Sequence, residues 1–163
     1  MSRTLTESPR TGIAHPFYRI DSSDWVNVVP VTSDRELVMI RQYRHGSREI
    51  TLEIPGGLVD EGESPSEAAA RELLEETGYR AASLERIGVV NPNPALFGNI
   101  CHTFLARDVE PVADSRGVGL EEIAVELLPV ADLPARLRAG EIDHALVVAA
   151  LYWFELAASG KAG

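Results

Sequence analysis

The feature that most constrains the fold is a helix start that closely follows a break in a strand. Residues 49–54 alternate polar and apolar side chains, which is typical of a half-buried strand, and they run into Pro55-Gly56-Gly57. The run Ser64-Pro65-Ser66-Glu67 supplies an N-cap, a proline at the first helical position and the acid of a capping box. Gly78 is a suitable C-terminal stop, so these signals predict a helix over 65–77.

The rest of the chain mixes strand and helix patterns. Apolar and β-branched runs predict strands over 25–32, 36–43, 84–90, 100–106 and 122–129, and helical spacing predicts helices over 133–139 and 143–156. Strands and helices mixed in this way predict a layered α/β domain. The length of 163 residues suits one domain over 13–163, preceded by a flexible N-terminal tail over 1–12.

The predicted helix carries an acidic stripe. Glu72, Glu75 and Glu76 are three and four residues apart, so they fall within about 100° of one face. A neighbouring face is expected to pack on the sheet, and its residues are Ala70, Leu73, Leu74 and Thr77. Carboxylate oxygens are hard ligands suited to Mg²⁺ or Mn²⁺.

A solvated acidic face, offset by Arg71 and Arg80, is the alternative, and the spacing of the acids alone favours it. The preceding loop favours the metal site, because Gly56 and Gly57 permit close backbone approach. The same loop adds Asp60, Glu61 and Glu63 to the acidic group.

These residues also match a known family pattern. Gly57, Glu63 and the run from Arg71 to Tyr79 (RELLEETGY) resemble the Nudix box, G-x5-E-x7-R-E-U-x-E-E-x-G-U, where U is bulky and aliphatic. Tyr79 at the last apolar position is the one departure. The resemblance implies a three-layer α/β/α sandwich with a mixed sheet.

The same resemblance assigns roles to the box residues. Glu72 and Glu76 are implied as the principal metal ligands, with Glu75 joining directly or through water. The backbone carbonyl of Gly56 is implied as a further ligand. Gly57, Glu63 and Arg71 take structural roles, the last two as an ion pair between loop and helix.

The flanks resemble the ADP-ribose and nucleotide-sugar pyrophosphatase branch of the family. The segments that carry this resemblance are Arg41-Gln42-Tyr43-Arg44 and Glu53-Ile54-Pro55-Gly56-Gly57, together with Pro94 past the box. The implied substrate-binding residues are Arg44, Glu53, Trp25 and Pro94. Arg44 can pair bidentately with a phosphate or be an ordinary surface arginine. Trp25 or Phe97 can stack on a base, although core packing is the more common use of either ring.

A general base is expected in the glycine-rich stretch before the strand at 122–129. Relatives place a catalytic or metal-binding glutamate in this loop, and Glu121 is the first choice for it, with Glu122 as the alternative. A solvated loop acid is the competing interpretation. Glu75 is the other candidate for a catalytic role.

The resemblance implies an Mg²⁺-dependent hydrolase, with Mn²⁺ able to substitute, that cleaves the diphosphate of ADP-ribose or a nucleoside diphosphate sugar. The products are a nucleoside monophosphate and a sugar phosphate. Two alternatives remain: action on nucleoside triphosphates or dinucleoside polyphosphates, and a non-catalytic module that binds nucleotide sugars. Relatives in this branch are commonly dimers, so a homodimer is expected.

Composition limits the kinds of binding partner and the cellular compartment that are expected. The formal net charge is −10, which repels long nucleic acids. Small nucleotides are still possible partners if cations bridge them to the acidic site. Cys101 is the single cysteine, so no internal disulfide can form. No apolar run approaches the roughly 18–20 residues of a membrane span. A cytoplasmic protein without membrane contact is expected.

Overall fold

Strand β3 (Trp25–Val31) is buried along most of its length, which places it inside the sheet. The computed structural model describes residues 1–113 and 123–160. In it, β3 runs parallel to β9 (Cys101–Arg107), while the other pairings in this sheet are antiparallel. The strand order is β11 (Ile123–Pro129), β4 (Glu36–Arg44), β3, β9 and β8 (Leu84–Val90), with β5 (Glu49–Glu53) paired to β4 and β6 (Gly56–Leu58) paired to β3.

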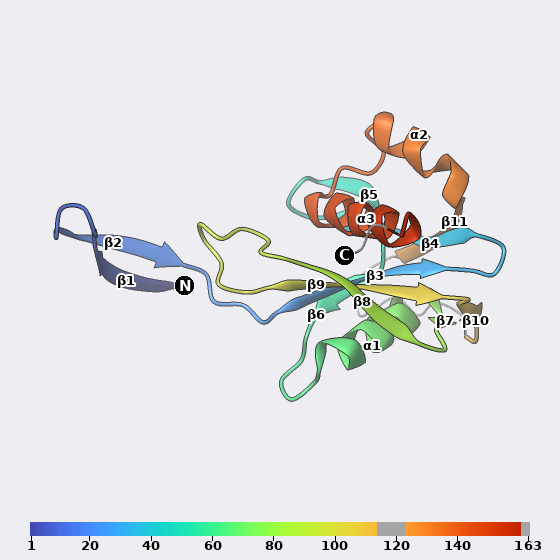
Figure 1. The fold of residues 1–163 in the computed structure, drawn as a ribbon, viewed down its shortest axis with the longest axis horizontal. Helices are drawn as coiled ribbons and strands as arrows, with labels where there is room; N and C mark the ends of the chain where they lie inside the picture. The colour runs from blue at the N-terminus through green and yellow to red at the C-terminus, as the bar shows by residue number, and fades with distance from the viewer. Residues whose placement is uncertain (114–122, 161–163) are drawn as a thin grey trace.

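Helices cover both faces of this sheet (Figure 1). Alternate side chains of β3 point to opposite faces, so Val28 packs beneath α1 (Pro65–Thr77) and Val29 beneath α3 (Ala145–Ala158). A 3₁₀ turn (Val130–Asp132) and α2 (Leu133–Arg138) lie on the α3 side. The predicted three-layer α/β/α sandwich with a mixed sheet is confirmed. Within the described residues, no helix has the length and apolar character needed to span a membrane.

Helix α1 begins and ends at the predicted residues, but its buried face differs from the expected one. Ala70 is exposed and Leu74 is only partly buried. The buried residues are Ala68, Ala69, Glu72, Leu73, Glu76 and Thr77. The helix is therefore rotated so that two of its carboxylates face inward, which the apolar pattern alone did not indicate.

Residues predicted as a loose tail form part of a hairpin. Strand β1 (Ser2–Glu7) pairs along its whole length with β2 (Ala14–Arg19), and the hairpin projects away from the sheet (Figure 1). Both strands are exposed, so no burial pattern marked them in the sequence. The short pair β7 (Tyr79–Arg80) and β10 (Glu110–Pro111) was likewise not predicted.

Candidate active site

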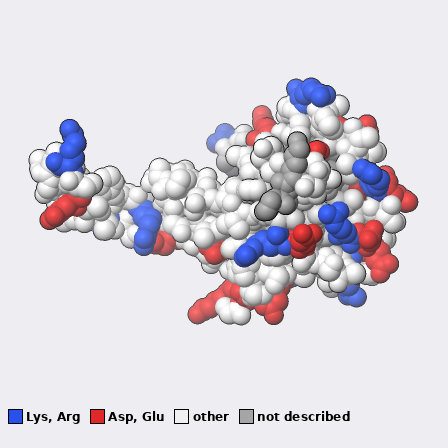
Figure 2. Space-filling view, viewed as in Figure 1, with Lys and Arg blue, Asp and Glu red and all other residues white. Residues whose placement is uncertain are grey.

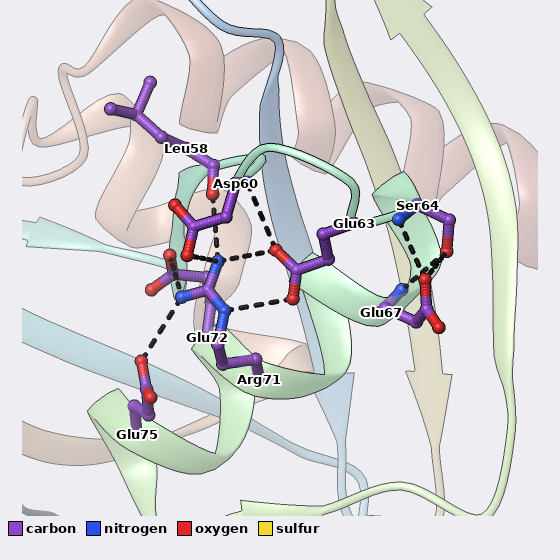
Figure 3. Close-up of polar contacts among 8 residues, drawn as sticks. All are labelled: Leu58, Asp60, Glu63, Ser64, Glu67, Arg71, Glu72 and Glu75. Carbon is purple, nitrogen blue, oxygen red and sulfur yellow. Dashed lines mark hydrogen bonds and ion pairs between the residues drawn. The ribbon is translucent and has the colours of Figure 1, made fainter.

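The loop before α1 is locked to the first turn of the helix. Ser64 Oγ accepts from the backbone N–H of Glu67 at 3.3 Å, and the backbone N–H of Ser64 donates to Glu67 Oε2 at 2.8 Å (Figure 3). This is the predicted capping box. At the other end Gly78 adopts φ 74° and donates to the carbonyl of Leu74, which ends the helix.

Arg71 joins this loop to the acidic stripe (Figure 3). Its guanidinium donates to both carboxylate oxygens of Glu63 at 3.0 Å, and to the carbonyl of Leu58 at 3.0 Å. A further nitrogen donates to Glu72 at 2.8 Å and to Glu75 at 3.3 Å. The hydrogen bond to Glu63 raises the pKa of Arg71 and lowers the pKa of Glu63. Arg71 thus lies between the loop and the stripe, with acids on both sides.

Glu72 and Glu76 lie against the double glycine rather than in solvent. Their exposed fractions are 8% and 4%. Glu76 Oε2 accepts from the backbone N–H of Gly56 at 2.9 Å, and a Cβ on Gly57 would collide with the carboxylate of Glu72. Burial raises the pKa of Glu72, more than the hydrogen bond and charge of Arg71 lower it. A solvated acidic face does not describe these two residues.

Glu75 differs from its two neighbours. Its side chain is 42% exposed and turns toward Arg71. Within the described residues, no three acidic, histidine or cysteine side chains converge closely enough to bind a metal in the arrangement seen here. The outer surface nearby is acidic as well: in Figure 2 acidic side chains gather at the lower edge of the body, over the loop that precedes α1.

A cavity of about 320 Å³ opens beside Gly56 and Gly57. Its floor is formed by the sheet, through Trp25, Val26, Asn27 and Cys101, and one wall by the start of α3, through His144, Leu146 and Val147. The remaining lining residues are Arg44, Glu53, Ile54 and Leu58. A volume near 300 Å³ lies at the lower end of small-molecule sites.

Arg44 and Glu53 form a bidentate pair in this cavity. Arg44 donates through Nε to Oε1 at 2.7 Å and through Nη2 to Oε2 at 2.6 Å, and Thr51 donates to Oε1 at 2.6 Å. Burial alone raises the pKa of Glu53, but these hydrogen bonds and the charges of Arg44 and His144 outweigh it and hold that pKa below its usual range. Part of the guanidinium fork expected to meet a phosphate is therefore directed at Glu53.

The other expected substrate residues are spread more widely. Trp25 lines the cavity and touches Phe97, with ring centroids 6.1 Å apart at 54°. Pro94 lies in an exposed loop outside the lining of this cavity. Glu121 and Glu122 lie outside the described residues.

A comparison with family models decides the broader assignment. The model described as the NUDIX domain matches residues 24–151. The chain belongs to the Nudix family. This Nudix domain extends from the start of β3 into α3, and so includes the loop, the acidic helix and the residues that line the cavity.

Several relatives of this Nudix chain are named for ADP-linked compounds, and another is named a GDP-mannose pyrophosphatase. An ADP-ribose pyrophosphatase of Bacillus subtilis is 35% identical over 64% of this chain, which spans 56% of that protein's length. An ADP-sugar pyrophosphatase of Mus musculus is 36% identical over 83% of this chain and 67% of its own length. A crystal structure of an ADP compounds hydrolase superposes with a TM-score of 0.83 at 27% identity, covering 98% of this chain and 86% of that one.

The residues of the Nudix loop and helix fit a divalent metal by their chemistry. Glu72, Glu75 and Glu76 offer carboxylate oxygens, the donors that Mg²⁺ prefers. Two of the three carboxylates are buried beside the Gly56–Gly57 backbone, and the burial of Glu72 disfavours its charge. A buried carboxylate with a raised pKa gains from a neighbouring cation. Glu75 must leave Arg71 to join them.

Asn27 and His144 belong to the site but were not among the predicted residues. Asn27 is 6% exposed, donates to the carbonyl of Leu146 at 3.1 Å and accepts from Cys101 and Thr103 at 3.3 Å. His144 enters the cavity from the residue before α3. Both positions depend on α3 folding back over the sheet, so no local sequence signal marks them.

Proposed function

We propose that this protein is an Mg²⁺-dependent hydrolase that cleaves the diphosphate of ADP-ribose or a nucleoside diphosphate sugar, with Mn²⁺ able to replace Mg²⁺. The products are a nucleoside monophosphate and a sugar phosphate. The observation that supports this most is the burial of Glu72 and Glu76 against Gly56 and Gly57, at the edge of a cavity with an aromatic side chain. The names of the relatives support the substrate class.

The metal donors proposed are the carboxylates of Glu72, Glu75 and Glu76 and the backbone carbonyl of Gly56. When bound, the metal neutralises phosphate oxygens and makes a water more acidic. Glu63, Arg71 and Gly57 hold the loop close to the helix, and Gly56 and Gly57 of this loop line the cavity. Arg44, Glu53, Trp25 and Pro94 are the proposed substrate-binding residues.

The reaction is a hydrolysis of one phosphoanhydride. A water oxygen forms a bond to one phosphorus, the bond from that phosphorus to the bridging oxygen breaks, and the bridging oxygen leaves with the other phosphate. The proton of the water passes to a carboxylate, for which Glu121 is proposed, with Glu122 and Glu75 as the alternatives.

A substrate panel tests this proposal. Phosphate-coupled detection is applied to ADP-ribose, GDP-mannose, UDP-glucose, diadenosine polyphosphates and nucleoside triphosphates, each with Mg²⁺, with Mn²⁺ and with EDTA. We expect the highest kcat/KM on a diphosphate-linked sugar and no turnover in EDTA. A preference for triphosphates or dinucleoside polyphosphates supports the other enzymatic alternative. Binding of nucleotide sugars without turnover supports a non-catalytic module, and full activity without metal contradicts the metal mechanism.

A cytoplasmic homodimer is the assembly we propose for this enzyme. The β1–β2 hairpin supports the dimer, because it projects from the body and carries the exposed apolar side chains of Leu5 and Tyr18. An isolated two-stranded hairpin is marginally stable in water, so packing against a second copy would stabilise it. The expected partner besides that copy is a small nucleotide substrate, with no nucleic acid or membrane.

A further inference from the structure

His144 is a cavity residue to which no role has yet been assigned. It is the N-cap residue of α3, but its side chain makes no capping hydrogen bond. Its Nδ1 atom is buried and has no hydrogen-bond partner in the described part of the chain. A buried polar atom without a partner costs free energy that a ligand can recover. The imidazole is therefore explained neither by capping nor, among the described residues, by a hydrogen bond of its Nδ1 atom.

Glu53, in the same cavity, retains one acceptor position. Among the described residues, its Oε1 accepts from Arg44 and Thr51, while its Oε2 accepts from Arg44. A carboxylate oxygen has two lone pairs, so Oε2 can accept one more hydrogen bond. His144 is close enough for its charge to act on Glu53. The cavity is thus lined by a carboxylate that can accept and by an imidazole that donates or accepts according to its tautomer.

The charges of Arg44, Glu53 and His144 determine which chemical group can bind among these side chains. Arg44 and Glu53 neutralise each other as a bidentate pair. A phosphate oxygen only accepts hydrogen bonds, so it cannot satisfy Glu53 and would be repelled by it. A hydroxyl donates to a carboxylate and can donate to or accept from an imidazole nitrogen, and it matches both tautomers.

The position of Glu53 and His144 in the cavity indicates which hydroxyl of the substrate they bind. The cavity is lined by Gly56 and Gly57, which lie against Glu76 and Glu72, and also by Glu53 and His144. In a nucleoside diphosphate sugar, the group next to the diphosphate is a sugar on either side. We propose that His144, together with Glu53, binds a hydroxyl of the sugar adjoining the diphosphate and so favours hydroxylated over deoxygenated substrates. The identity of this ligand rests on the proposed function.

Binding of reaction products tests this site without relying on turnover. Calorimetric titration in Mg²⁺ compares ribose 5-phosphate with 2-deoxyribose 5-phosphate, and AMP with its 2′-deoxy and 3′-deoxy forms. We expect the wild type to bind the hydroxylated member of at least one pair about three- to tenfold more tightly, the range of a single hydrogen bond. His144→Phe should abolish that preference and raise the KM for ADP-ribose by a similar factor, with kcat changed less than about twofold.

Two variants control for folding and for the loss of a ring. His144→Asn retains an amide near the Nδ1 position and is a favourable N-cap, so it should recover part of the preference. His45→Phe makes the same change at an exposed histidine outside the cavity and should leave both affinities unchanged. Melting temperatures of the three variants that are no lower than that of the wild type exclude unfolding as the cause.

Several outcomes overturn the inference: no preference in the wild type, an undiminished preference in His144→Phe, or a fall in kcat with KM unchanged. A loss of discrimination between AMP and inosine monophosphate, with the hydroxyl preference intact, assigns His144 to the base and also overturns it. A wild type that hydrolyses no diphosphate substrate, yet shows the hydroxyl preference that His144→Phe removes, contradicts the proposed function and leaves this binding site standing.

Discussion

Glu76 is held by the same loop whose metal it is proposed to bind. The contact from Gly56 to its Oε2 needs only an acceptor, and a glutamine retains one. Glu76→Gln should therefore leave the melting temperature of the metal-free protein nearly unchanged. Because an amide oxygen is a weaker donor to Mg²⁺ than a carboxylate, kcat should fall at least about a hundredfold.

Steady-state kinetics with a Mg²⁺ titration checks this result, and Glu85→Gln, at an exposed acid on β8, is the matched control. If Glu76→Gln unfolds the protein while activity per folded molecule persists, Glu76 has a structural role.

Burial of Glu72 predicts how stability depends on pH. Its pKa is raised by desolvation, so folding favours the neutral acid. That contribution is present below the ordinary carboxyl pKa and is lost as pH rises through the raised value. At pH 7 Glu72→Gln should raise the melting temperature of the metal-free protein by a few degrees, with little effect near pH 4.

Mg²⁺ should stabilise the wild type and have less effect on Glu72→Gln, because binding to the folded state alone adds to stability. Thermal unfolding between pH 4 and 8, in EDTA and in Mg²⁺, measures both effects. A variant that is less stable at pH 7 in EDTA would show that the contact with Arg71 outweighs burial.

Glu121 is proposed as the base from sequence alone. Loss of a base in Glu121→Gln should lower kcat by roughly 10²–10⁴-fold, with KM and the Mg²⁺ requirement close to wild type. Loss of a ligand would instead raise the Mg²⁺ concentration for half activity. A Mg²⁺ titration of kcat for Glu122→Gln in parallel shows which of the two glutamates is the base. Unchanged rates in both variants would assign the role of general base to Glu75.

At the scale of elements, the loop before α1 and the helix itself are joined through one guanidinium. Arg71 contacts Glu63, Leu58, Glu72 and Glu75 in several directions at once. Lysine keeps the charge but loses the planar fork that makes these contacts possible. Arg71→Lys should lower the melting temperature by a few degrees and reduce kcat about tenfold or more, because the proposed donors lose their alignment.

Thermal unfolding and kinetics of Arg71→Lys beside Arg86→Lys, an exposed arginine on β8, check this expectation. A drop in stability with unchanged kcat would limit Arg71 to a structural brace, and no change in either would remove it from the site.

At the scale of the molecule, the projecting hairpin is the proposed dimer contact. Leu5 and Tyr18 lie on one face of the hairpin. Tyr18 pairs with Arg3, and Arg3 lies two positions before Leu5 on the same strand, so these side chains point to the same side. Replacing both with glutamate places charges in the proposed interface and should convert a dimer to a monomer. Thr4→Glu, on the opposite face, is the control.

Light scattering after size-exclusion chromatography gives the masses. A monomeric wild type, or a double variant that remains dimeric, contradicts the proposed role of the hairpin.

Local signals in the sequence were sufficient for the elements that carry the proposed metal donors. The capping box at Ser64 and the stop at Gly78 determined both ends of α1, because caps satisfy backbone groups within a few residues. Alternating or continuous apolar runs marked β3, β4, β5 and β8 within a residue or two. The acidic positions of the Nudix box were marked by the match to the whole box, because their spacing alone favoured a solvated acidic face.

Contacts between distant segments decided what local patterns could not. Strand β6 forms because Gly56 lets the backbone approach β3, and the inward rotation of Glu72 depends on the space left by Gly57. The cavity requires α3 to close over the sheet, where Asn27 reaches Leu146 across 119 residues of sequence. His144 and Glu53 share that cavity for the same reason. The periodicity of a sequence indicates which face of a helix or strand is apolar. Which other element packs against that face depends on the packing of the whole chain.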